Sequence, residues 1–213
     1  MLITGFEGYG GRRDNPSEEI ARALNGAVID DATINAAVLP VTNYNLRDNI
    51  VALIEKYQPA VVLCLGLAPG ENMIRLERVA ANYSRFEIKD NAGEIQRGPI
   101  IEGGPEAYQT TLPLDRLQSA LLECGIPARV SHSAGTFLCN AVMYHALDYC
   151  AVHCPDTRCG FIHLPYMPSQ VRDLVSRVQE KKSSELEHRS DLASMSLADQ
   201  TKAITAVIQL LAE

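Results

Sequence analysis

Short apolar runs alternate with amphipathic stretches along most of the chain. The apolar runs cover residues 2–4, 34–41, 60–67, 73–83, 128–133 and 159–164. Stretches with apolar residues at helical spacing cover 17–24, 44–57, 114–124, 140–148, 169–182 and 197–211. Because the apolar runs lack a regular polar alternation, they predict strands buried on both faces of a mostly parallel sheet. The alternation of the two patterns therefore predicts an α/β fold, with a twisted sheet and helices on both of its faces.

Two segments interrupt this alternation. Residues 84–105 are polar and rich in glycine, which predicts an irregular excursion or a hairpin. Residues 180–195 have the highest local density of charge and serine, and they predict a mobile connection before the last helix. Neither segment is typical of a domain boundary, and the sequence contains no internal repeat. We expect residues 1–213 to form a single domain, because this length can bury one sizeable core.

Composition narrows the possible functions. The formal net charge is −7, so the chain lacks the basic surface that binding to nucleic acid requires. The N-terminus has neither a basic segment nor a long apolar one, and the longest apolar run is about half the length of a membrane-spanning helix. We therefore expect a cytoplasmic protein that binds neither nucleic acid nor a membrane. In that compartment the six cysteines are not evidence of disulfides.

The loop after the first apolar run contains several glycines and precedes a helix, for which Ser17 is a possible N-cap. A dinucleotide fingerprint starting at Gly8 would require a glycine where Arg13 stands. A phosphate-binding P-loop would require a Gly-Lys-Ser/Thr sequence that is missing here. The loop is therefore interpreted as a turn and not as a nucleotide site.

Thiols and an imidazole gather between residues 150 and 163. A zinc-binding or interaction module could use Cys150, Cys154, Cys159 and His163. The spacing fits no common structural zinc site well, since such sites usually have closely paired ligands. We keep this module as an alternative function.

The segment SHSAGTFLCNAVMYH, residues 131–145, places Cys139 where a helix is expected to begin. Gly135 can turn the chain sharply just before it. Unpaired N–H groups and the positive end of the helix dipole favour a thiolate at such a position. A buried cysteine ordinarily acts as a small apolar side chain, but this placement predicts a nucleophile.

A nucleophilic thiol needs an imidazole and a group that orients the imidazole. His163 ends an expected strand before a proline-rich turn, and His132 is its rival. Glu77 lies in an apolar strand, where an unpaired charge is costly to bury, so it could orient the imidazole. It could equally be a surface residue paired with Arg75 or Arg78.

Four segments resemble the pyrrolidone carboxyl peptidase (pyroglutamyl peptidase I) family of cysteine peptidases, over nearly the whole chain. They are TGFEGYGG with the following NPS, GLAPGENMIRLERVAAN, VSHSAGTFLCN and GFIHLPYMPSQ. The resemblance implies that Cys139 is the nucleophile, His163 the base and Glu77 the residue that orients it.

The resemblance also implies the reaction. It implies an exopeptidase that hydrolyses the amide bond after an N-terminal pyroglutamyl residue of peptides, through a thioester acyl-enzyme. No metal or organic cofactor is implied, and the family suggests a homo-oligomer, specifically a tetramer.

Substrate-binding residues follow from the same resemblance. Phe6 and Tyr9 occupy positions where the family places aromatic residues of the substrate pocket, and Phe137 lies two residues before the nucleophile. Glu87 stands where the family typically has an arginine. Arg85, two residues earlier on the same face of an extended strand, is a candidate to replace that arginine. The acidic residue also raises the alternative of a catalytically impaired relative.

Overall fold

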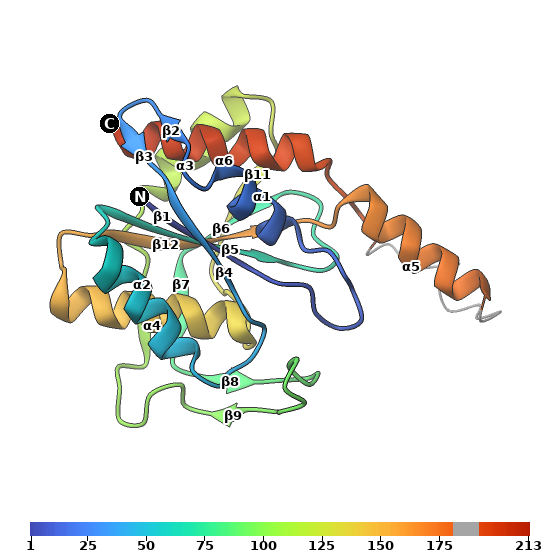
Figure 1. The fold of residues 1–213 in the computed structure, drawn as a ribbon, viewed down its shortest axis with the longest axis horizontal. Helices are drawn as coiled ribbons and strands as arrows, with labels where there is room; N and C mark the ends of the chain where they lie inside the picture. Colours follow the sequence, from blue (N-terminus) through green and yellow to red (C-terminus); the bar gives the residue numbers. More distant parts are fainter. Residues whose placement is uncertain (181–191) are drawn as a thin grey trace.

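The centre of the molecule is a six-stranded sheet with the order β11–β6–β12–β5–β1–β4 (Figure 1). The computed structural model describes residues 1–180 and 192–213. The strands of this sheet are β1 (Leu2–Phe6), β4 (Asn35–Leu39), β5 (Val61–Leu67), β6 (Ile74–Glu77), β11 (Ala128–Ser131) and β12 (Arg158–Leu164). Neighbouring strands run parallel except for β6 and β12, which are antiparallel. The prediction of a mostly parallel sheet is confirmed.

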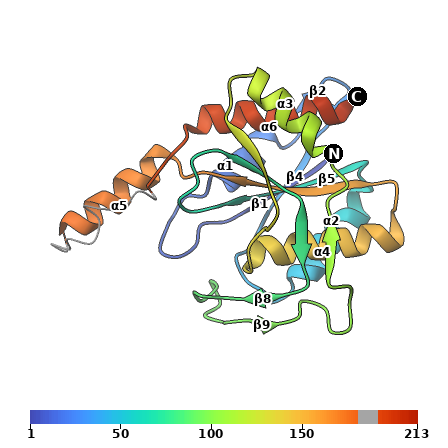
Figure 2. The same ribbon diagram turned by 180° about the vertical axis from the view of Figure 1, so that it is seen from behind.

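Helices cover both faces of this sheet (Figures 1 and 2). One face carries α1 (Pro16–Leu24), α3 (Leu114–Glu123) and α6 (Leu197–Ala212). The other face carries α2 (Leu46–Tyr57) and α4 (Leu138–His153). Each face has its own apolar core, and the sheet contributes side chains to both. The predicted α/β architecture of three layers is therefore confirmed.

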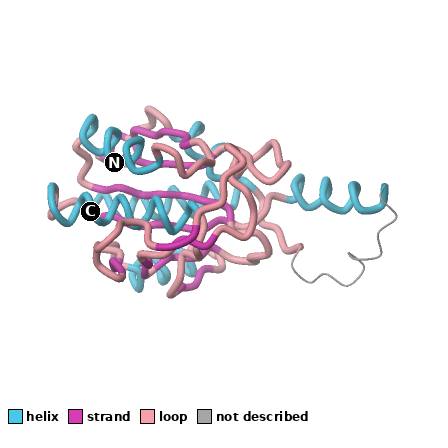
Figure 3. The backbone as a smooth tube through the Cα atoms, turned by 90° about the horizontal axis from the view of Figure 1, so that it is seen from below, coloured by secondary structure: helices cyan, strands magenta, loops and turns pink. Residues whose placement is uncertain are grey.

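One helix is much longer than predicted, and another projects from the sheet. The helix expected at 140–148 is α4, which starts at Leu138 and continues to His153. Its middle is buried because the sheet covers one side and α2 packs against another, so polar residues are not needed there. The helix expected at 169–182 is α5 (Pro168–Glu180), which extends sideways from the sheet (Figure 3). Most of the connection predicted at 180–195 lies outside the described residues.

Ser17 is not the N-cap of α1, contrary to the prediction. The cap is Asn15, whose side chain accepts a hydrogen bond from the Ser17 N–H at 3.1 Å. Pro16 then begins the helix, where its missing N–H costs nothing. The Ser17 hydroxyl instead accepts a hydrogen bond from the Phe6 N–H at 3.0 Å, which ties α1 to the end of β1.

The apolar run at 73–83 forms two strands instead of one. After β6 the chain leaves the central sheet, and β7 (Val79–Ala81) pairs with β10 (Ala107–Gln109) in a separate small sheet. The polar segment that follows contains the antiparallel pair β8 (Ser84–Arg85) and β9 (Arg97–Gly98), which confirms a hairpin. A further small hairpin joins β2 (Val28–Ile29) to β3 (Ala32–Thr33).

Within the described ranges, no helix is long and apolar enough to cross a membrane.

Candidate active site

Strand alternation brings the candidate residues to one face of the sheet. Leu65, Leu76 and Ile162 belong to the core beneath α1, α3 and α6. Their sequence neighbours therefore face the opposite layer, where α4 begins. In the strand register His163 of β12 pairs with Gly66 of β5 on one side and with Arg75 of β6 on the other.

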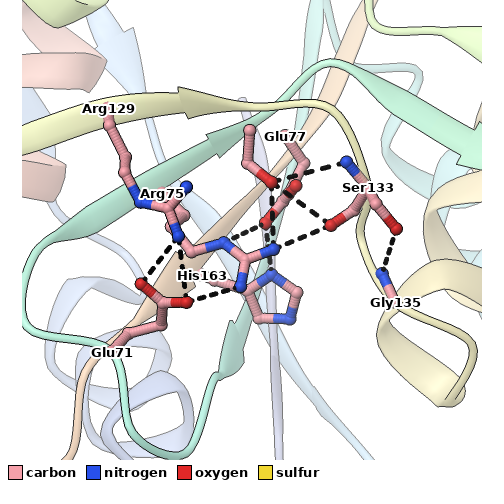
Figure 4. A network of polar contacts seen from close by, with 8 residues as sticks. Glu71, Arg75, Glu77, Arg129, Ser133, Gly135 and His163 are labelled. Carbon is pink, nitrogen blue, oxygen red and sulfur yellow. Dashed lines mark hydrogen bonds and ion pairs between the residues drawn. The ribbon is translucent and has the colours of Figure 1, made fainter.

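Glu77 and His163 form a buried pair. The Nδ1 atom of His163 lies 2.7 Å from Oε1 of Glu77, and Figure 4 shows the two side chains pointing toward each other. Glu77 is fully buried, so it is not the surface residue that the sequence left open. Because the carboxylate accepts the proton of Nδ1, the other ring nitrogen, Nε2, is left for a second partner. The structure thus joins two residues that lie 86 positions apart in the sequence.

Arg75 also approaches the same carboxylate oxygen. Its Nε atom lies 3.0 Å from Oε1 of Glu77, an ion pair inside the protein. Its Nη1 atom donates to Glu71 at 2.7 Å, and its Nη2 atom donates to the hydroxyl of Ser131 and to the carbonyl of Ser133. The sequence suggested Arg75 only as a surface partner of Glu77, but the structure makes it the centre of a network (Figure 4).

Cys139 is the second residue of α4, so the prediction of a thiol at a helix N-terminus is confirmed. Gly135 has φ +83°, which is the turn that the sequence predicted before it. The thiol lies over Gly66: a Cβ atom at Gly66 would be 2.8 Å from Sγ of Cys139 and 2.7 Å from the ring of Phe161. Since Gly66 pairs with His163 across the sheet, the thiol and the imidazole occupy neighbouring positions.

Gly66 is a position of the candidate site that the sequence did not suggest. The signal was present, because a glycine inside an otherwise apolar strand often marks close approach by another group. Here the approaching group is the Cys139 side chain. The absence of a side chain at Gly66 gives the thiol its place over the sheet.

Burial opposes the ionisation of Cys139 that its place at a helix N-terminus was expected to favour. Burial raises the pKa of Cys139 to about 12, and the negative charge of Glu77 adds to the effect. The positive charge of Arg75 and the backbone N–H act in the opposite direction, but they are smaller contributions. The loss of hydration is the largest of these contributions. A thiolate forms here only if a neighbouring group takes up the proton as a positive charge.

Aromatic side chains surround the start of α4. The ring centroids of Tyr9 and Phe137 are 6.0 Å apart, and Phe86 packs against Phe137 at 4.5 Å. Burial raises the pKa of Tyr9, and the proximity of Cys139 is the next cause. Phe6 is buried in the apolar core on the same side of the sheet. Tyr9 and Phe137, both partly buried, therefore lie at the site, and Phe6 packs in the core of the same layer.

The remaining sequence candidates lie on the surface. The side chains of Arg85, Glu87 and His132 are exposed. The backbone N–H of Arg85 donates to the carbonyl of Thr136 at 2.9 Å, so β8 lies against the loop before α4. Within the described ranges neither the Arg85 nor the Glu87 side chain makes a hydrogen bond or ion pair.

The residues of the zinc-binding alternative do not come together as a metal site. The thiol of Cys150 contacts those of Cys154 and Cys159. His163 is committed to Glu77 instead. Among the described residues, no group of three or more His, Cys, Asp or Glu side chains is arranged to hold a metal ion.

A thiol at a helix start beside a buried imidazole and carboxylate defines the site of a cysteine hydrolase. The comparison with known proteins agrees with this class. The family model described as pyroglutamyl peptidase matches residues 1–213. The chain therefore belongs to the pyroglutamyl peptidase family.

Individual relatives show the same similarity. A pyrrolidone-carboxylate peptidase from Pyrococcus furiosus is 42% identical over 180 residues, which cover 84% of this chain and 86% of that protein. One from Bacillus subtilis is 42% identical over 177 residues, 81% of each chain. Among solved structures, a mutant pyrrolidone carboxyl peptidase from P. furiosus matches with a TM-score of 0.91 and 38% identity, covering 100% of this chain and 98% of that one. For pyroglutamyl peptidase I of Bacillus amyloliquefaciens the TM-score is 0.85 with 38% identity, covering 98% and 94%.

Proposed function

We propose that this protein is a cysteine exopeptidase that hydrolyses the amide bond after an N-terminal pyroglutamyl residue of peptides. The observation that carries the proposal is the 2.7 Å contact between His163 and Glu77 beside the Cys139 thiol. Membership of the pyroglutamyl peptidase family supplies the substrate class.

In the proposed mechanism Cys139 passes its proton to Nε2 of His163 as Sγ attacks the pyroglutamyl carbonyl carbon. The imidazolium, stabilised by Glu77, then protonates the leaving amine, and a thioester remains on Cys139. Water, deprotonated by His163, attacks the thioester and releases 5-oxoproline and the free thiol. Because burial raises the pKa of Cys139, we expect the proton transfer to accompany attack. Backbone N–H groups at the start of α4 would contribute about 3 kcal/mol per donor to stabilising the oxyanion.

Recognition of the lactam ring is assigned to the aromatic groups beside the thiol. Tyr9 and Phe137 present partly buried rings near Cys139 and suit a small, flat, uncharged ligand. Phe6 is proposed to support this pocket from the core, in which it is buried. Arg85 is proposed as a contact at the rim, supported by the hydrogen bond from its backbone to the loop before α4.

The test is release of a fluorescent amine from a pyroglutamyl amide under reducing conditions. The wild-type protein should be active, and Cys139→Ala should lower kcat at least about 10⁴-fold, as loss of a catalytic nucleophile does. The Cys124→Ala variant, which removes a thiol from the C-cap of α3, is the matched control and should keep full activity. A folded wild type without activity would instead support the impaired relative, and activity in Cys139→Ala would exclude this nucleophile.

Three broader properties are proposed with the activity. Residues 1–213 would form one peptidase domain, which is supported by the single central sheet that both apolar cores share. A cytoplasmic location is supported by six cysteines that are all unpaired in the structure. A homotetramer rests on resemblance to the family, and light scattering on the purified protein would test it.

A further inference from the structure

One oxygen atom of Glu77 serves two partners. Oε1 lies 2.7 Å from Nδ1 of His163 and 3.0 Å from Nε of Arg75, and Figure 4 shows both approaching it. The arginine is itself mostly buried, with 17% of its side chain exposed. A buried carboxylate between an imidazole and a guanidinium is held from two directions. The position of Glu77 against the imidazole therefore depends on the arginine as well.

The same guanidinium reaches the segment that leads to the nucleophile. Nη2 of Arg75 donates to the carbonyl of Ser133 at 2.7 Å and to the hydroxyl of Ser131 at 2.9 Å. The Ser133 hydroxyl in turn accepts a hydrogen bond from the N–H of Gly135, the turn residue before α4. Arg75 thus connects the strand that carries Glu77 to the loop that positions Cys139.

The charge of Arg75 acts on the thiol through space. Glu77 raises the pKa of Cys139, and Arg75 lowers it. The titratable and charged groups around this centre come from every element packed on it: Glu71 before β6, Arg75 and Glu77 on β6, Arg129 on β11, His163 on β12, Cys64 on β5, Cys139 on α4 and Tyr9 after β1. Arg75 pairs directly with Glu77 and keeps its positive charge whatever the state of His163.

We propose that Arg75 is a positioning residue for the reaction, which holds the Glu77 carboxylate against His163, fixes the loop before Cys139 and offsets the charge of Glu77 at the thiol. This inference rests on the proposed function, because it assumes that Cys139 and His163 exchange a proton. It assigns Arg75 no contact with the substrate.

The experiment compares pH profiles of kcat/KM for pyroglutamyl amide hydrolysis. Replacing Arg75 by methionine removes a positive charge, so proton loss from both the thiol and the imidazolium becomes less favourable. Both limbs of the profile should therefore move to higher pH in Arg75→Met. On the acid limb kcat/KM should fall about 10-fold, which is the size expected for loss of one nearby charge, whereas on the alkaline limb the same displacement should maintain or raise it.

Two further variants separate charge from structure. Arg129→Met removes a cation that binds the same Glu71 but does not contact Glu77, and its profile should keep the wild-type position. Arg75→Lys retains the charge but loses the planar fork to Ser133, so kcat/KM should fall without displacement of the profile. Arg75→Lys also keeps the test decisive if Arg75→Met does not fold, because a displaced profile in the lysine variant overturns the proposal.

Other results would overturn it as well. An equal loss at every pH in folded Arg75→Met would show a purely structural role. An equal displacement in Arg129→Met would show a general field effect and no specific role of Arg75. These failures are distinct from failure of the proposed function, since that is measured separately by the activity of the wild type and of Cys139→Ala.

Discussion

The two ends of α4 carry cysteines in opposite electrostatic situations. At the N-terminus burial and Glu77 raise the pKa of Cys139 to about 12. Near the C-terminus hydrogen bonds from Cys159 and Cys154 lower the pKa of Cys150. Ease of ionisation alone would therefore select Cys150 as the nucleophile. In the proposed mechanism it is the neighbouring base, and not the isolated thiol, that makes the N-terminal end of this helix the reactive one.

The difference lies in what each thiol can exchange a proton with. Cys150 is 4% exposed and its hydrogen-bonding partners are other thiols, which do not store a proton as a cation. Cys139 lies beside an imidazole that contacts a buried carboxylate at 2.7 Å. The more reactive of the two thiols should therefore be the one beside the imidazole and its carboxylate. Three substitutions test this expectation.

The largest effect is expected from Glu77→Gln. The amide has nearly the same shape as the carboxylate but cannot stabilise the imidazolium by charge, so kcat should fall about 10³-fold or more. The measurement is kcat for pyroglutamyl amide hydrolysis, together with the thermal unfolding midpoint. If kcat is retained, the carboxylate does not support His163, and the contrast between the two ends of α4 loses its explanation.

Glu71→Gln is the matched control for this substitution. It also removes a carboxylate bound to Arg75, at 2.7 Å, but it leaves the contact between Glu77 and His163 in place. Its effect on kcat should be far smaller than that of Glu77→Gln. Equal losses in the two variants would assign the effect to the whole network and not to the carboxylate beside the imidazole.

Gly66→Ala should give the second-largest effect. The added methyl group would lie 2.8 Å from Sγ of Cys139, closer than carbon and sulfur tolerate, so the thiol must move. Misplacement of a reacting atom by about 1 Å can cost about 10²-fold in rate. The measurement is kcat of the folded variant, because Phe161 is crowded by the same methyl group and stability should fall too.

Gly160→Ala controls for that loss of stability. Its methyl group would collide with Thr110 and Leu112, a similar steric conflict on another central strand but away from the thiol. It should lower the unfolding midpoint while each folded molecule keeps its activity. A comparable loss of kcat in Gly160→Ala would mean that strain anywhere in the sheet disables the site.

The parts of the fold that depend on local pattern were predictable from the sequence. Apolar runs and helical periodicity predicted the strands, the helices and the layers, because burial imposes those patterns locally. The cap of α1 was misassigned because Asn15 and Ser17 both suit that position. The chain changes sheets after Glu77, and the pattern of apolar and polar residues does not mark that position.

The residues of the proposed site could be named from the sequence, but their arrangement could not. Cys139 was predicted as the nucleophile from the turn before a helix, whereas its raised pKa depends on burial by distant segments. The role of Arg75 depends on β6 running beside both β11 and β12, a pairing that no local pattern encodes. The importance of Gly66 could not be predicted for the same reason, because the side chain that packs against it, Cys139, lies 73 positions further along the chain.

The smallest effect on activity is expected from Cys150→Ala. This change deletes the thiol whose pKa is lowered, at the end of α4 away from the imidazole, so kcat/KM should stay at the wild-type value. The free energy of unfolding should fall by about 1 kcal/mol, the cost of losing one buried group of this size. Amine release and denaturant unfolding measure the two quantities. A large loss of kcat with little loss of stability would show that the thiols at the C-terminus of α4 take part in the reaction, and would reverse the assignment of its two ends.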